Sequence, residues 1–123
     1  MQRTSVRRVV WVLVWLLGMT AMQAGAADGS SQPQLPSKLQ HVVFTGGDGS
    51  SCEKAIVIQH AANNLEGVAA EKAWISWKYP KAKLKNQGLS GIGNKTFDRL
   101  EIETADGASK TICFDITDFF GQW

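Results

Sequence analysis

The sequence predicts a small α+β domain: one main helix packed on an antiparallel sheet of three to four strands, with a C-terminal β-hairpin and one disulfide. One segment, 65–79, has the apolar spacing, the cap and the terminating proline of a helix. Short β-branched or alternating runs lie on both sides of it, and Asp106-Gly107 separates the last two. The length of 123 residues admits one small domain and excludes a large multidomain enzyme.

Residues 1–26 are predicted to be a secretory signal peptide, because a basic start, an apolar run and small residues follow one another. The apolar run of about 14 residues is shorter than the roughly 20 that span a bilayer, so we expect cleavage, after Ala26 or Ala27, and membrane contact only before it. Arg7-Arg8 leaves the twin-arginine route as an alternative. The mature chain is then nearly neutral and is exported to the periplasm or beyond.

The two cysteines, Cys52 and Cys113, are predicted to form a disulfide. An even number of cysteines in a small exported domain favours a bridge, and a Cys-x-x-Cys metal or redox motif is missing from the sequence. Closing a loop of about 60 residues would stabilise the fold by about 4 kcal/mol.

The mature chain begins with a predicted flexible tail over residues 27–38, which has one large apolar side chain, and the domain follows over 39–123. A strand is expected over 41–44. The glycines at 46–49 indicate a turn, because the Lys-Ser/Thr of a phosphate-binding loop is missing. Ser50 with Glu53 predicts a capped helical turn, and 55–58 predicts a buried strand.

The main helix is expected over 65–79, with Asn63 as its cap and Pro80 as its end. It carries two apolar stripes on nearly opposite sides. The first is Ala70, Ala73, Trp74 and Trp77, and the second is Leu65, Val68, Ile75 and Tyr79. Either one stripe meets the sheet while the N-terminal segment covers the other, or the tryptophan stripe remains a contact surface.

A strand over 82–90 and a glycine-rich turn over 88–93 are expected to precede the C-terminal hairpin of 96–104 and 108–117. A three-residue hairpin loop, 105–107, pairs Thr104 with Ala108 and has Gly107 in the left-handed region. This register places five apolar side chains on one face of the sheet: Leu100, Ile102, Ile112, Phe114 and Ile116. Cys113 must then point to the opposite face, where Cys52 should reach it.

Catalytic residues are few. His41 and His60 are the only histidines and have no metal-binding spacing, and the pair Asp115 and Asp118 is expected to be a solvated strand end. We therefore expect no catalytic residues, no metal, no cofactor and no enzymatic activity.

Positive charge is concentrated beside the predicted tryptophan stripe. The chain between Glu71 and Asp98 has no acid and six lysines. Such a pattern is typical of a solvated surface that favours solubility. The alternative is that these lysines contact an anionic partner. The predicted binding surface consists of Trp74, Trp77, Tyr79, Lys78, Lys81, Lys83 and Lys85. Nucleic acid is not an expected partner of a slightly acidic exported domain.

The C-terminus is aromatic, with Phe119, Phe120 and Trp123 among its last five residues. We expect Phe119 or Phe120 to fold back onto the sheet and close the core.

Several segments resemble a group of small, mostly bacterial proteins that has no assigned activity. They include Tyr79-Pro80, Phe-Asp-Ile at 114–116 and Phe-Phe-Gly at 119–121, and the resemblance covers most of 48–121. A helix, Tyr-Pro and strands ending in Phe-Asp also look like PepSY and β-lactamase-inhibitor-like modules. That resemblance implies binding or inhibition of envelope and secreted enzymes.

We therefore expect a non-catalytic binding or inhibitory module, monomeric, that acts on an envelope or secreted protein or on an anionic envelope polymer. A small periplasmic hydrolase-like enzyme and a structural envelope protein are the alternatives.

Overall fold

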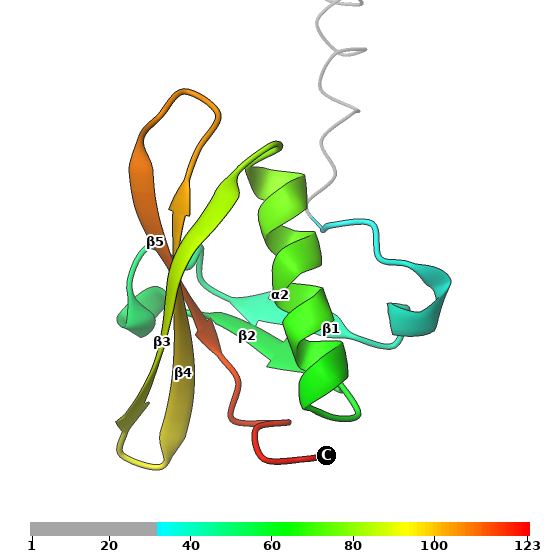
Figure 1. The fold of residues 1–123 in the computed structure, drawn as a ribbon. Helices are drawn as coiled ribbons and strands as arrows, with labels where there is room; N and C mark the ends of the chain where they lie inside the picture. The colour runs from blue at the N-terminus through cyan, green and yellow to red at the C-terminus, as the bar shows by residue number, and fades with distance from the viewer. Residues whose placement is uncertain (1–31) are drawn as a thin grey trace, which may run out of the picture. The chain divides into compact units, whose positions relative to one another are not determined.

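Five strands form one sheet, and one long helix lies across a face of it (Figure 1). The computed structural model describes residues 32–123. Its elements, in chain order, are η1 (Ser37–Leu39), β1 (Val43–Gly46), η2 (Cys52–Lys54), β2 (Ile56–Gln59), α2 (Asn64–Lys78), β3 (Lys83–Ile92), β4 (Lys95–Glu103) and β5 (Ser109–Asp115). The α+β class with one disulfide is confirmed.

The sheet is larger than predicted and is mixed, with the strand order β1-β2-β5-β4-β3. All neighbours are antiparallel except β2 and β5, which run parallel through Ile56 opposite Phe114 and Val57 opposite Asp115. The expected three to four antiparallel strands were therefore too few. The reason is that both short N-terminal strands, of four residues each, join the sheet: β2 pairs with β5, and β1 pairs with β2.

The C-terminal hairpin has the predicted register. The Thr104 N–H donates to the Ala108 carbonyl at 2.8 Å, and Gly107 has the left-handed φ of 91° that the three-residue loop requires. All five apolar side chains predicted for one face belong to one buried cluster beneath α2.

The disulfide Cys52–Cys113 lies on the other face of the sheet, as the register predicted, with Ala55 and Phe97. The preceding glycine-rich loop lies beside β5, where the Gly49 carbonyl accepts the Cys113 N–H at 2.8 Å. Its N–H groups donate within the protein, from Gly47 to Ala55 and from Gly49 to Lys54, which agrees with a turn rather than a phosphate site.

Two local predictions need correction. Ser51, not Ser50, caps η2, because its Oγ accepts the Lys54 N–H at 3.3 Å. The turn expected over 88–93 is displaced to Gly93 and Asn94, since β3 extends to Ile92. Edge strand β3 tolerates Gly88 and Gly91 because it pairs on one side only, with β4.

Helix α2 agrees with the prediction within one residue at each end, and Asn63 Oδ1 accepts the Glu66 N–H at 2.9 Å. Its tryptophan stripe faces the sheet. The rings of Trp74 and Phe114 meet edge to face with centroids 5.7 Å apart, and Ala70 is fully buried.

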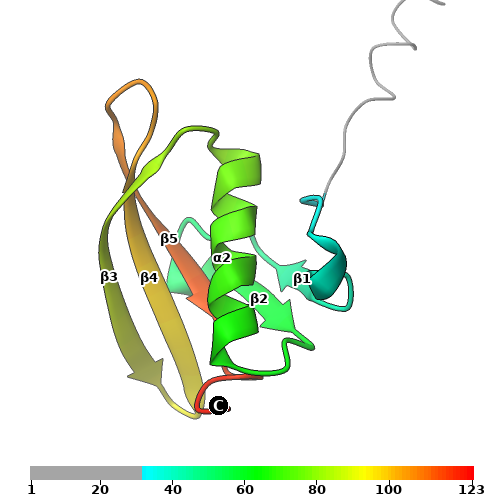
Figure 2. The ribbon, with the colours of Figure 1, turned by 45° about the vertical axis from the view of Figure 1, so that its right-hand side comes forward.

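The chain ends of the described part both contact the domain. In the predicted tail, Pro33 is buried and Leu35 packs against the core, while the predicted signal peptide and residues 27–31 lie outside the described residues. At the other end Phe119 is buried and Phe120 is half-exposed. Figure 2 shows this C-terminal end beneath the start of α2. Residues 32–123 include no helix that is long and apolar enough to span a membrane.

Candidate functional site

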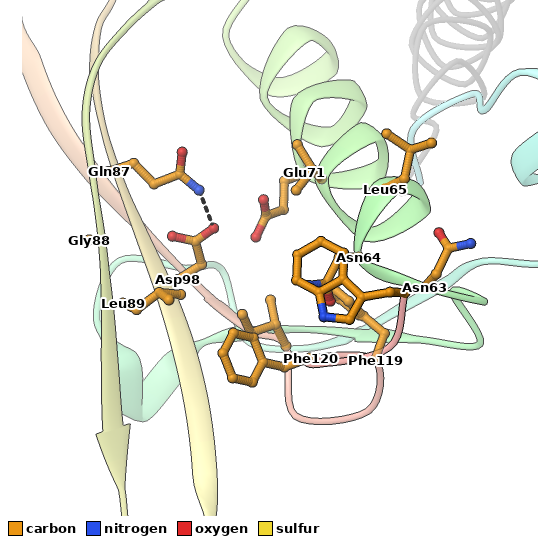
Figure 3. Close-up of a pocket in the computed structure, with 13 residues that line it drawn as sticks. Asn63, Asn64, Leu65, Glu71, Gln87, Gly88, Leu89, Asp98, Phe119 and Phe120 are labelled. Carbon is orange, nitrogen blue, oxygen red and sulfur yellow. Dashed lines mark hydrogen bonds between the residues drawn. The ribbon is translucent and has the colours of Figure 1, made fainter.

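A cavity of about 950 Å³ opens between α2, strands β3 and β4, and the C-terminal segment (Figure 3). Its walls are mainly apolar, with a small number of polar groups. The lining residues are Asn63, Asn64, Leu65, Val68, Glu71, Gln87, Gly88, Leu89, Asp98, Ile116, Phe119, Phe120 and Trp123.

The helix contributes one wall through its second apolar stripe. Leu65 and Val68 belong to that stripe, and Glu71 follows at the same three-residue spacing, so all three project from one side of α2. Leu65 is 80% exposed at the rim, whereas Glu71 is buried at the inner end. The open part of α2 is therefore the start of the second stripe, while Ile75 and Tyr79 at its other end pack in the core with Trp74.

The sheet contributes the opposite wall. Leu89 of β3 stands opposite Asp98 of β4, and Gln87 stands opposite Leu100, which faces the core. Because residues directly opposite one another share a face of the sheet, Gln87, Leu89 and Asp98 all face α2. The Gln87 amide donates to Asp98 Oδ2 at 2.6 Å and orients that carboxylate.

The C-terminal segment closes one end of the cavity. It is held to the start of α2 by two hydrogen bonds, from the Asn64 N–H to the Gln122 carbonyl at 2.8 Å and from the Gly121 N–H to Asn64 Oδ1 at 3.1 Å. The Phe119 ring lies against the backbone of Gly67, where a Cβ atom would overlap the ring.

Gly67→Ala is expected to lower the free energy of unfolding by about 1–3 kcal/mol, because the added methyl group overpacks against Phe119. This loss should appear in urea unfolding even though alanine is the better helix former. Gly88→Ala is the matched control, since a Cβ there meets no atom within 4 Å. Equal stability of Gly67→Ala and wild type would mean that Phe119 does not pack on this helix.

Glu71 is the most unusual group in the cavity. It is 1% exposed, and neither of its carboxyl oxygens has a hydrogen-bond partner in the described chain. Burial, and then the charge and hydrogen-bonding side chain of nearby Asp98, raise the pKa of Glu71 to about 9, while Lys72 acts in the opposite direction. The Glu71 carboxyl is therefore protonated and neutral at pH 7.

Asp98 completes a carboxyl pair with Glu71. It is 3% exposed, and its Oδ1 has no hydrogen-bond partner within residues 32–123. Figure 3 shows the two carboxyl groups pointing toward each other from α2 and β4. An apolar cavity with two convergent acids is a typical small-ligand or side-chain binding site.

The predicted binding surface is not assembled as expected. Trp74 is 6% exposed and packs in the core, so it cannot contact a partner. Trp77 and Tyr79 are half-buried against the same core. Lys78 lies over the Trp77 ring at 5.8 Å, and Lys85 pairs with Glu103 at 3.6 Å. Lys81 and Lys83 are exposed, and the cavity is lined by none of these residues.

The histidines and aspartates considered for catalysis are also away from the cavity. His41 Nε2 contacts Glu66 Oε1 at 2.7 Å, and Asp118 accepts the backbone N–H of His60 at 2.8 Å. Asp115 is not solvated as predicted: it is 6% exposed, and its Oδ1 accepts the hydroxyl and the N–H of Thr117. The described residues contain no group of three or more potential metal ligands.

The sequence contains a signal for the carboxyl pair. Asp98 alternates with Leu100 and Ile102, so the predicted register already placed it on the core face. Glu71 lies three residues after Val68 and four before Ile75, inside the second apolar stripe. An acid within an apolar pattern is therefore the feature that marks this site.

Comparisons with protein-family models, with curated proteins and with solved structures find no match for this chain. The two resemblances seen in the sequence therefore stay predictions.

Proposed function

We propose that the protein is an exported, non-catalytic binding module and that the cavity between α2 and β3–β4 holds part of its partner. The observation that carries this proposal is the buried carboxyl group of Glu71, whose two oxygens have no hydrogen-bond partner in the described chain. Leaving such groups unpaired is unfavourable, and a bound partner that donates hydrogen bonds would remove that penalty.

The walls of the cavity support binding of an apolar group. Leu89 and Phe120 are 57% and 43% exposed, and both line the opening. Neighbouring exposed apolar side chains are typical of contact surfaces in small domains. The volume also falls within the range of about 300–1,000 Å³ that is usual for ligand pockets. We infer that the partner, an envelope or secreted protein, inserts an apolar segment here.

A neutral apolar dye, N-phenyl-1-naphthylamine, tests the cavity without assuming any charge on the partner. Leu89→Ser is expected to weaken dye binding by at least about tenfold, because a leucine contact is lost from the wall. Leu84→Ser is the matched control. It removes a 47% exposed leucine from the same strand, outside the cavity.

Two tryptophans provide an internal check of where the dye binds. The indole N–H signal of Trp123, which lines the cavity, should shift in NMR spectra, while that of Trp77 should not. Dye binding that Leu89→Ser leaves unchanged, or a shift at Trp77 alone, would contradict the proposed site.

A hydrolase-like enzyme is the second candidate, favoured by the raised pKa of Glu71, which would suit a proton donor. We rank it second because the described lining has no hydroxyl, thiol or imidazole, which leaves the Asp98 carboxylate as the candidate nucleophile. Turnover of chromogenic esters or glycosides by the wild type, but not by Glu71→Gln, would favour the enzyme.

A further inference from the structure

We propose that the cavity selects a cation carried on an apolar body, a guanidinium or an ammonium group, which pairs with the carboxyl groups of Glu71 and Asp98. This inference rests on the proposed function, since it names the chemical class that the cavity binds.

The carboxyl pair lacks a cationic partner from the protein. Three of its four oxygens, Glu71 Oε1, Glu71 Oε2 and Asp98 Oδ1, have no hydrogen-bond partner among the described residues. The fourth, Asp98 Oδ2, accepts from the neutral Gln87 amide. The ion pairs in residues 32–123 involve Glu66 and Glu103 instead. A bound cation would therefore not have to displace an ion pair already formed by the described residues.

The hydrogen-bonding capacity of the site fits such a group. Once Glu71 has lost its proton, both carboxylates only accept hydrogen bonds, so the partner has to supply the donors. A guanidinium has five N–H donors in a plane and an ammonium has three, and both form the stronger, charge-assisted bonds with carboxylates. An anion would be repelled by Asp98, and a neutral alcohol supplies one donor for three free oxygens.

The walls around the acids fit the apolar body of the cation. Leu65, Val68 and Leu89 lie on either side, and the aromatic rings of Phe120 and Trp123 lie at the C-terminal end. Trp123 is 97% exposed, so its indole face is open to stacking against a guanidinium. An arginine or lysine side chain flanked by apolar residues has this composition, as does a small aromatic amine.

Binding should be coupled to the proton on Glu71. Asp98 on β4 and Lys72 on α2 act on Glu71, whereas β3 and the C-terminal segment line the cavity with uncharged side chains. Because the pKa of Glu71 is about 9, its proton must leave when a cation takes its place. Affinity should therefore rise by about tenfold per pH unit between pH 6 and 8, with release of one proton.

Three probes that share one body separate charge from apolar contact: 4-phenylbutylguanidine, 4-phenylbutanol and 4-phenylbutanoate. We expect the guanidine to bind at least tenfold more tightly than the alcohol at pH 8, and the carboxylate to bind most weakly. Calorimetry in two buffers of different ionisation enthalpy should report the released proton.

Matched variants test the residues. Glu71→Gln and Asp98→Asn should each remove most of the preference for the guanidine, and Glu71→Gln should also remove its pH dependence. Glu101→Gln, on the same strand as Asp98 but outside the cavity, should change neither the preference for the guanidine nor its pH dependence. Glu71→Gln replaces a carboxyl that is already neutral with a neutral amide of the same shape, so it is expected to fold.

The outcomes separate this inference from the proposed function. Equal binding of all three probes would overturn the cation selection and leave an apolar binding site. Failure of the three probes and of N-phenyl-1-naphthylamine would overturn both. The peptides acetyl-Leu-Arg-Phe-amide and acetyl-Leu-Gln-Phe-amide identify the source of the cation. If the arginine peptide binds more tightly than 4-phenylbutylguanidine, the cation comes from a protein side chain. If 4-phenylbutylguanidine binds more tightly, the cation comes from a small amine or guanidine.

Discussion

Raising the pH from 5 to 8 is expected to increase the unfolding equilibrium constant by about a thousandfold, through the titration of one buried carboxyl group. The pKa of Glu71 is about 9 in the folded chain against an ordinary value of 4.5. Between these values the folded chain holds a proton that the unfolded chain has released. The stabilisation is thus complete below the lower value and declines as the pH approaches the higher one.

Urea unfolding at several pH values, compared between wild type and Glu71→Gln, isolates this effect. The wild-type constant should rise by about tenfold per pH unit, while the variant should lack that component. Asp48, Glu66 and Asp106 do not interfere, since hydrogen bonds lower their pKa values and their effect falls on the acid side. Parallel pH profiles of wild type and variant would show that Glu71 ionises freely in the folded protein.

Loss of the Cys52–Cys113 disulfide is expected to destabilise the domain by about 4 kcal/mol, because the unfolded chain gains the freedom of an opened loop of about 60 residues. The bridge spans 61 positions and ties η2, which precedes β2, to the central strand β5. A domain of this size has a total stability of about 5–15 kcal/mol, so much of it depends on this link.

The Cys52→Ala/Cys113→Ala variant and the chemically reduced wild type should unfold at similar urea concentrations, both well below the oxidised wild type. Agreement between the two separates the link itself from the packing of the sulfur atoms beside Phe97. A loss of less than about 1 kcal/mol in both would show that the denatured chain is already restricted in this region.

Alternation along the strands explains why the C-terminal hairpin could be predicted. Leu100 and Ile112 have to share one face, which a three-residue loop allows and a two-residue Asp-Gly loop does not, so the loop and the position of Cys113 followed. The pairing of β2 with β5 could not be predicted in this way. It depends on where α2 and β3 carry the chain in three dimensions, and it involves only two residue pairs.

The orientation of α2 was not determined by its sequence. Both of its stripes are apolar, and either could face the sheet until the fit of Trp74 against Phe114 decides between them. The cavity was also hidden, because it requires Phe119 to fold back against Gly67 and two acids 27 positions apart to meet. Such contacts are tertiary and leave little periodic signal.

The buried acids weaken the fold at neutral pH, and a pair of apolar residues at the same positions would be expected to stabilise it. Glu71 and Asp98 lie at the inner end of an open apolar cavity. Their position connects this loss of stability with binding. The disulfide offsets part of this loss of stability. Its presence is compatible with an oxidising, extracellular location.

An NMR titration of the Glu71 side-chain carboxyl, without and with saturating 4-phenylbutylguanidine, tests the cavity most directly. The pKa of Glu71 is expected to be about 9 in the free protein and to be lowered by the bound cation, with no such change on addition of 4-phenylbutanol. A Glu71 pKa near its ordinary value in the free protein, or one that the guanidine leaves unchanged, would contradict this expectation.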